Sequence, residues 1–197
     1  KNPEHKILLM SLRQISQHLG KHNELVSYLK VLIQKNPKVD HLKHTLALTY
    51  LADKKWPEAE NVLKQQLKGK QKDSDAYLLL ARLYQGQNKK AEMEAVLLKG
   101  IAALTDNLQL MNELARFYIA NKNYVEAIKA YESVIKKYPD NNVATNNLAD
   151  LLITHQGHNK QRIDQALQLV KPFQYESNAV MQDTYGWVQL KAGNSKE

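Results

Sequence analysis

Polar side chains that can form directional hydrogen bonds recur in this chain at a fixed interval. Arginine or aspartate stands at intervals of thirty-four residues, at Arg82, Arg116 and Asp150, and asparagine does so at Asn112 and Asn146. An arginine can bind a carboxylate through two parallel hydrogen bonds, and an asparagine amide can both donate to and accept from a peptide backbone. Alternatively, Arg116 and Asp150 pair with each other as structural support, because close opposite charges commonly do so.

Histidines are the other candidates for chemistry, as ligands of a metal ion. His41 and His44 share one face of an expected helix, whereas His18 lies further along its own helix. At ~1.5 Å per residue this separation is too great for ligands that bind one ion at ~2.1 Å. We therefore predict no metal site and no cofactor. His155 and His158 are expected to be solvated.

The chain shows no nucleophile elbow, no phosphate-binding loop and no pair of carboxylates on a defined scaffold. The sequence therefore predicts a protein that is not an enzyme.

The elements that position the polar residues are helical hairpins, and residues 108–141 show the pattern best. Apolar residues from Leu108 to Tyr118, and again from Tyr124 to Ile135, recur at steps of three and four, which is typical of one helix face. Turn-forming residues separate the two faces at 121–123, and Pro139 ends the second helix. The small Ala115 and Ala127 allow the two helices to approach closely.

This hairpin resembles the tetratricopeptide repeat, a family with about thirty-four residues per unit. Numbered from Leu108, the large residues Met111, Leu114 and Tyr118 stand at positions 4, 7 and 11, and Ala115 and Ala127 at positions 8 and 20. The same frame covers nearly the whole chain. The resemblance implies an all-α, right-handed solenoid in one domain, with repeats at 6–39, 40–73, 74–107, 108–141 and 142–178 and a half repeat at 179–197.

Two repeats depart from the family frame. In the first, Arg13 and Leu25 occupy positions 8 and 20, so its helices are expected to pack less closely, and Gly20 is expected to end its first helix at positive φ. In the fifth, residues 155–162 form an enlarged turn of about five extra residues. We interpret that turn as a tolerated surface insertion, with a contact loop as the alternative.

The resemblance also implies a binding groove lined by the first helix of each repeat. Carried over repeat by repeat, its predicted peptide-binding residues are Leu48, Leu51, Arg82, Asn112, Arg116, Ile119, Asn146, Asp150, Ile153 and Trp187. Apolar and polar rows side by side suit an extended peptide or a partner helix. The Lys and Asn set that family members use to hold chaperone C-termini is absent, since Met10 and Gln14 stand there.

Net charge offers an alternative function. Residues 1–73 carry fourteen Lys or Arg against seven Asp or Glu, and the rest of the chain is nearly balanced. This half could bind a polyanion, either an acidic polysaccharide or a nucleic acid. Few aromatic residues interleave the lysines, which argues against single-stranded nucleic acid. Solvated lysines on an outer face are the simpler interpretation.

Cysteine content and apolar runs limit the other possibilities. The chain has no cysteine, which excludes disulfides and thiolate metal sites, and no apolar run approaches the ~18 residues that span a bilayer. It begins without Met, and its repeat frame is cut at both ends, so we expect a piece of a longer protein. The open end after Lys191 suggests self-association as a further hypothesis.

Residues 183–194, "DTYGWVQLKAGN", resemble a segment of tetratricopeptide proteins from bacterial cell envelopes. These include lipoproteins that accompany exosortase-type sorting and exopolysaccharide export. The resemblance implies a protein-binding scaffold in the bacterial periplasm or envelope, active in assembly or export.

Overall fold

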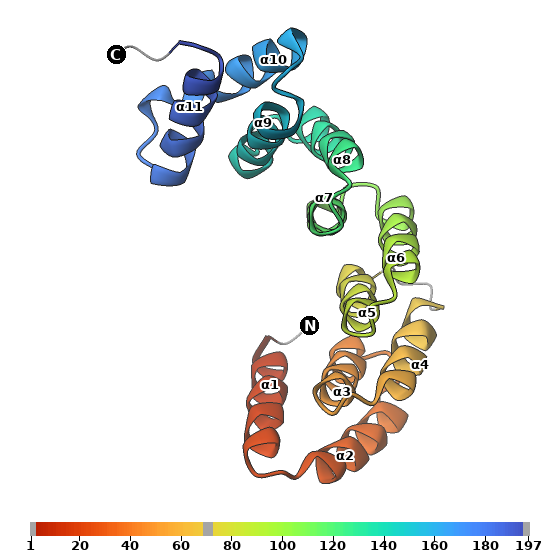
Figure 1. Cartoon of the computed structure of the whole chain (residues 1–197). Helices are drawn as coiled ribbons and strands as arrows, with labels where there is room; N and C mark the ends of the chain where they lie inside the picture. Colours follow the sequence, from red (N-terminus) through yellow and green to blue (C-terminus); the bar gives the residue numbers. More distant parts are fainter. Residues whose placement is uncertain (1–2, 69–72, 195–197) are drawn as a thin grey trace. The chain divides into compact units, whose positions relative to one another are not determined.

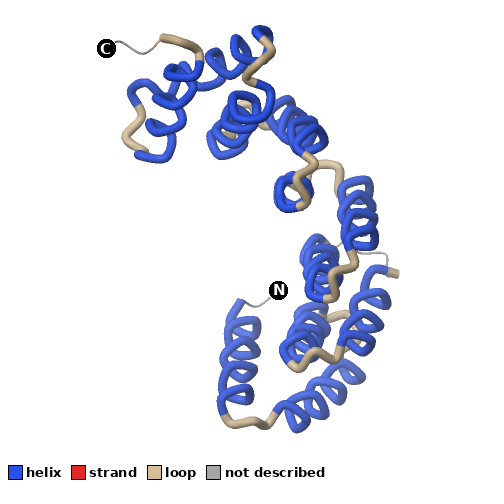
Figure 2. The backbone as a smooth tube through the Cα atoms, in the orientation of Figure 1, coloured by secondary structure: helices blue, strands red, loops and turns tan. Residues whose placement is uncertain are grey.

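The computed structural model describes residues 3–68 and 73–194, and within these ranges the chain is almost entirely helical, with no strand. This confirms the predicted all-α fold (Figures 1 and 2). The chain divides into two compact units, Lys1–Leu110 and Met111–Glu197. The elements are α1 (Pro3–His18), α2 (His22–Lys35), α3 (Asp40–Ala52), α4 (Trp56–Leu67), α5 (Ser74–Gly86), α6 (Lys90–Ala103), α7 (Leu108–Ala120), α8 (Tyr124–Lys137), α9 (Asn142–Gln156), α10 (Lys160–Val170), the 3₁₀ helix η1 (Lys171–Tyr175) and α11 (Ala179–Lys191).

The predicted repeat frame coincides with the observed helix starts. Helices α3, α5, α7 and α9 begin at residues 40, 74, 108 and 142, as expected for the first helices of four repeats. Polar side chains support three of these starts, because Asp73, Asn107 and Asn141 each accept a hydrogen bond from a backbone N–H of the first turn. A single continuous solenoid over 1–197 stays a prediction.

The hairpin turns repeat one backbone conformation. Gly20, Lys54, Asn88 and Lys122, spaced by thirty-four residues, all have positive φ, between 55° and 66°. The next N–H then reaches back five residues, as in the 2.9 Å bonds from Lys55 to the Tyr50 carbonyl and from Asn123 to the Tyr118 carbonyl. This is a Schellman-type helix end. The predicted role of Gly20 is confirmed, and Lys or Asn adopts the same conformation in later repeats.

Small residues are buried where the paired helices approach. At position 8 of the second to fifth repeats, Ala47, Ala81, Ala115 and Ala149 are at most 1% exposed. At position 20, Ala59, Ala127 and Ala166 are completely buried. Larger side chains around them, such as Leu63 and Tyr131, complete a core that is continuous within each unit.

The prediction of an enlarged turn at residues 155–162 is wrong. Helix α9 runs on to Gln156 and α10 begins at Lys160, so only residues 157–159 lie between them. One contact with the preceding repeat and one local contact favour this arrangement. The His155 ring stacks on Tyr124 with centroids 3.5 Å apart, and the Asn159 side chain accepts from the N–H of Gln161 at 2.9 Å. The added residues therefore extend the end of α9 and the start of α10.

Within the described ranges, no helix has both the length and the apolar character needed to cross a bilayer.

The turn conformation leads to a stability prediction. A residue with a Cβ pays roughly 1–2 kcal/mol to occupy the left-handed region, whereas glycine does not. We expect Lys122→Gly to stabilise the second unit by about 0.5–1 kcal/mol and Gly20→Ala to destabilise the first by about 1 kcal/mol. Denaturant unfolding followed by circular dichroism measures both, and a Lys136→Gly control, inside α8, should destabilise.

A partly exposed ion pair predicts a pH dependence of stability. The Lys64 ammonium lies 2.7 Å from Glu60 Oε1, the Tyr84 hydroxyl donates to the same oxygen at 2.8 Å, and together they lower the pKa of Glu60. The stabilising contribution is therefore complete above the ordinary carboxyl pKa of about 4.3 and is lost as pH falls through the lower folded value. The difference in free energy of unfolding between wild type and Glu60→Gln should be constant from pH 6 to 9 and should become smaller below about pH 4.

Candidate peptide-binding surface

First helices and second helices lie on opposite sides of each unit. In the first unit α3 and α5 are neighbours on one side, with α4 and α6 on the other (Figure 1). We call the side formed by the first helices the first-helix face. In the first unit it presents Arg82 as an exposed side chain and Leu48 and Leu51 as half-buried ones.

In the second unit the first-helix face consists of the described parts of α7, α9 and α11. Arg116 and Asp150 are exposed, and Asn112, Ile119 and Asn146 are half-buried. Ile153 is only 3% exposed, so it presents little surface except as the wall of a pocket.

The alternative in which Arg116 pairs with Asp150 does not hold. No ion pair joins them in the described structure, and the Asp150 carboxylate instead accepts a hydrogen bond from the Thr154 hydroxyl at 3.3 Å. The Arg116 charge lies near the Tyr131 phenol of α8. Burial raises the pKa of Tyr131, and the Asn147 amide and the Arg116 charge oppose that rise. The charges of Arg116 and Asp150 therefore both remain available to a ligand.

Asn112 and Asn146 each have a side-chain oxygen for which no described residue is a hydrogen-bond partner. The side-chain oxygens of Asn112 and Asn146 are buried, and neither accepts a hydrogen bond from any described residue. A buried acceptor left unpaired costs about 1–3 kcal/mol. Both side chains are only half-buried, so a rotation that brings each oxygen to the surface would let a peptide N–H donate to it.

A pocket of 280 Å³ lies between the ends of α9 and α11. It joins the predicted Ile153 and Trp187 to residues that sequence reasoning left out of the site, His155, Gly157 and His158. Lys191 also lines it, with its ammonium 4.5 Å from the centre of the Trp187 ring. Because no carboxylate among the described residues lines the pocket, its cationic and aromatic groups suit an acidic or aromatic side chain.

His155 and His158 are exposed, as the sequence predicts, and they nevertheless line this pocket. The signal that could have found them is the possibility of extending α9, which contains no helix breaker before Gly157.

The structure brings together a different group of metal-ligating residues from the one considered in the sequence. His44 lies 3.7 Å from Asp73 and 3.9 Å from Asp75, and Gln66 donates to Asp73 at 2.6 Å. Asp73 also caps α5. We interpret the group as a network that secures the start of α5. It escaped sequence reasoning because its members come from two repeats.

Basic residues of the first unit are partly neutralised. Lys21, Lys43, Lys55 and Lys64 each lie within 2.7–3.7 Å of a carboxylate. Such exposed pairs add little stability, but they reduce the net positive surface that a polyanion would meet. This disfavours the polyanion alternative.

Hairpins in register, with buried small residues at their crossings, define the chain as an α-solenoid protein. Residues 19–83 and 113–141 match family models described as tetratricopeptide repeat. The chain belongs to the tetratricopeptide-repeat family. A search of curated proteins finds no match.

Solved structures share the fold at low identity. A tetratricopeptide repeat protein from Parabacteroides merdae is 17% identical with a TM-score of 0.53, over 98% of this chain and 74% of that one. The MamA protein is 19% identical with a TM-score of 0.57, over 90% and 98%. A thermophilic protein from Thermus thermophilus is 16% identical with a TM-score of 0.53, over 94% and 99%. These similarities establish the fold.

The unpaired asparagine oxygens lead to a test that needs no ligand. Replacing Asn146 by Leu removes a buried, unsatisfied acceptor, so we expect Asn146→Leu to stabilise the second unit by about 1 kcal/mol. The neighbouring Asn147 is the matched control. Its amide donates to the Tyr131 hydroxyl at 3.0 Å, so Asn147→Leu should destabilise. Thermal unfolding of the two variants measures both effects, and equal destabilisation would contradict our interpretation of Asn146.

Proposed function

We propose that this protein is a non-enzymatic scaffold that binds a peptide segment on the first-helix face of its second unit. The family favours protein partners. The observation that carries the proposal is the pair of buried, unpartnered oxygens of Asn112 and Asn146. Natural proteins tolerate such unsatisfied groups mainly where function requires them.

Each group on this face has a part in the proposed complex. The two asparagine oxygens accept peptide N–H groups, and exposed Arg116 binds a carboxylate of the peptide with two hydrogen bonds. The Trp187 pocket takes a side chain further along the peptide. Leu48, Leu51 and Arg82 offer a comparable surface on the first unit, where peptide binding stays a prediction.

The cellular setting is part of the proposal. The resemblance of residues 183–194 supports a role in a bacterial envelope assembly or export system. Fractionation of the source cells tests it, because recovery of the full-length protein with the cytosolic fraction alone would contradict an envelope role. Self-association stays a further hypothesis, which light scattering at several concentrations tests.

The peptide-binding proposal is tested with a peptide selected from a random displayed library against the immobilised chain. We expect Arg116→Ala to weaken binding of that peptide by about tenfold, because a hydrogen bond to a charged group contributes ~1.5–3 kcal/mol. The double variant Asn112→Ala with Asn146→Ala should weaken binding comparably. Fluorescence anisotropy of the labelled peptide measures both.

The matched control is Lys136→Ala, an exposed cation on the second helix α8, which should leave affinity unchanged. Arg82→Ala, measured separately, tests the first unit. Unchanged affinity in both the Arg116 and the Asn112/Asn146 variants would remove this face from the function.

A further inference from the structure

The first hairpin opens where the other hairpins close. Helices α1 and α2 diverge from their turn, whereas α3 and α4 lie side by side (Figure 1). Arg13 and Leu25 stand where the other repeats have alanine at one or both crossing positions. Side chains of this size keep two helices apart, since close approach requires small residues at the contact. The predicted looser packing of this hairpin is thus seen in the structure.

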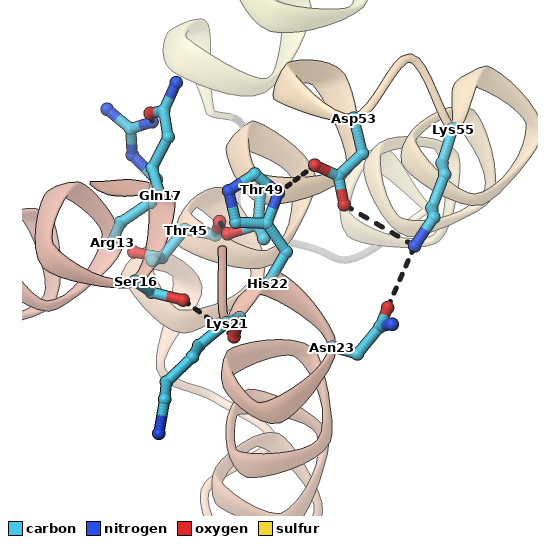
Figure 3. Close-up of polar contacts among 10 residues, drawn as sticks. All are labelled: Arg13, Ser16, Gln17, Lys21, His22, Asn23, Thr45, Thr49, Asp53 and Lys55. Carbon is cyan, nitrogen blue, oxygen red and sulfur yellow. Dashed lines mark hydrogen bonds and ion pairs between the residues drawn. The ribbon is translucent and has the colours of Figure 1, made fainter. Parts of the chain in front are cut away.

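A polar cluster holds the opened hairpin at its turn. His22, at the start of α2, bonds Asp53 in the turn after α3, and Lys55 lies 3.5 Å from the same carboxylate (Figure 3). Lys55 also donates to Asn23 at 3.1 Å, and the Ser16 hydroxyl donates to the Lys21 carbonyl at 2.8 Å. The contacts from His22 and Asn23 attach the start of α2 to the next repeat, so the turn between α1 and α2 is held in place.

The opening forms an apolar cleft of 410 Å³, which we call the N-terminal cleft. Its lining includes Leu8, Leu9 and Leu12 of α1, Tyr28 and Leu32 of α2, and Leu42 of α3. Its volume falls within the ~300–1,000 Å³ of typical ligand sites.

Exposed apolar side chains extend from the cleft along both helices. On α1 they form a stripe with helical spacing, Leu8, Leu12 and Ile15, of which Leu8 is 65% exposed, and the exposed Leu19 follows directly after the helix. On α2, Tyr28 and Val31 are about half exposed. Contiguous apolar surface of this kind marks an interaction site, and a stripe the length of a helix exceeds what a small molecule would cover. The geometry suits a helix laid in a groove.

Charge around the cleft indicates the partner's chemistry. The chain between Glu24 and Asp40 carries Lys30, Lys35 and Lys38 and no carboxylate. None of the three lysines forms an ion pair in the described structure, unlike Lys21 and Lys43 nearby. Lys35 follows Tyr28 by seven residues, so it continues the same face of α2 beyond the cleft.

We propose that the N-terminal cleft binds an amphipathic helix of another protein, with leucine-like residues entering the cleft and carboxylates facing Lys35 and Lys38. This is a second interaction surface, located in the first unit, and it does not depend on peptide binding by the second unit.

The test uses a fluorescein-labelled synthetic helix of about five turns, with leucines at helical spacing and glutamates on its flanks. We expect saturable binding that weakens with added salt. Leu8→Ser and Tyr28→Ser should each weaken binding by about tenfold, and the double variant Lys35→Glu with Lys38→Glu should do so as well. Leu8 and Tyr28 are more than half exposed, so both variants should fold, as circular dichroism will verify.

The matched control is Met10→Ser. Met10 is exposed on α1 but does not line the cleft, so this variant should bind as tightly as wild type. A second probe replaces every glutamate of the synthetic helix by lysine, and it should not bind. Equal binding of the two probes, or binding of the acidic probe unaffected by Leu8→Ser and Tyr28→Ser, would overturn the proposal. So would a dimer in sedimentation velocity that Leu8→Ser dissociates, because a second copy would then cover the cleft.

Discussion

The close approach of the two helices in each hairpin is the constraint on which the structure depends. A helix pair can bury a continuous apolar seam only if the residues at its crossing are small, and Ala115 and Ala127 satisfy this in the fourth repeat without any exposed surface. The frame of thirty-four residues follows, because each turn must end one helix and start the next in the same geometry. Arg13 and Leu25 break the constraint, and there the hairpin opens.

The two proposed surfaces differ in the physical reason for binding. On the second unit, none of the described residues donates to the buried oxygens of Asn112 and Asn146, so a ligand gains by supplying hydrogen bonds. On the first unit, the α1 stripe leaves apolar carbon in water, so a ligand gains by covering it. One surface therefore selects for backbone geometry and the other for an apolar helix face. A scaffold with both could hold two partners.

Much of the fold could be predicted because its cause is local and repeated. The starts of α3, α5, α7 and α9 follow from residues within each unit of thirty-four. The fifth repeat shows the limit. Residues 155–162 carry turn-forming types, yet the structure extends α9 through His155 and Gln156, because a ring from the preceding repeat, Tyr124, stacks on His155. No local pattern contains that contact.

Sequence alone determined the class of protein and the register of its helices, since both follow from spacing along the chain, and it predicted which residues share the first-helix face. Tertiary structure decided which of those residues can act. It buried Ile153, left Arg116 unpaired with Asp150 and joined Trp187 to a pocket with His158. The physical reason is that burial and pairing depend on neighbours from other repeats, whose distances no single repeat encodes.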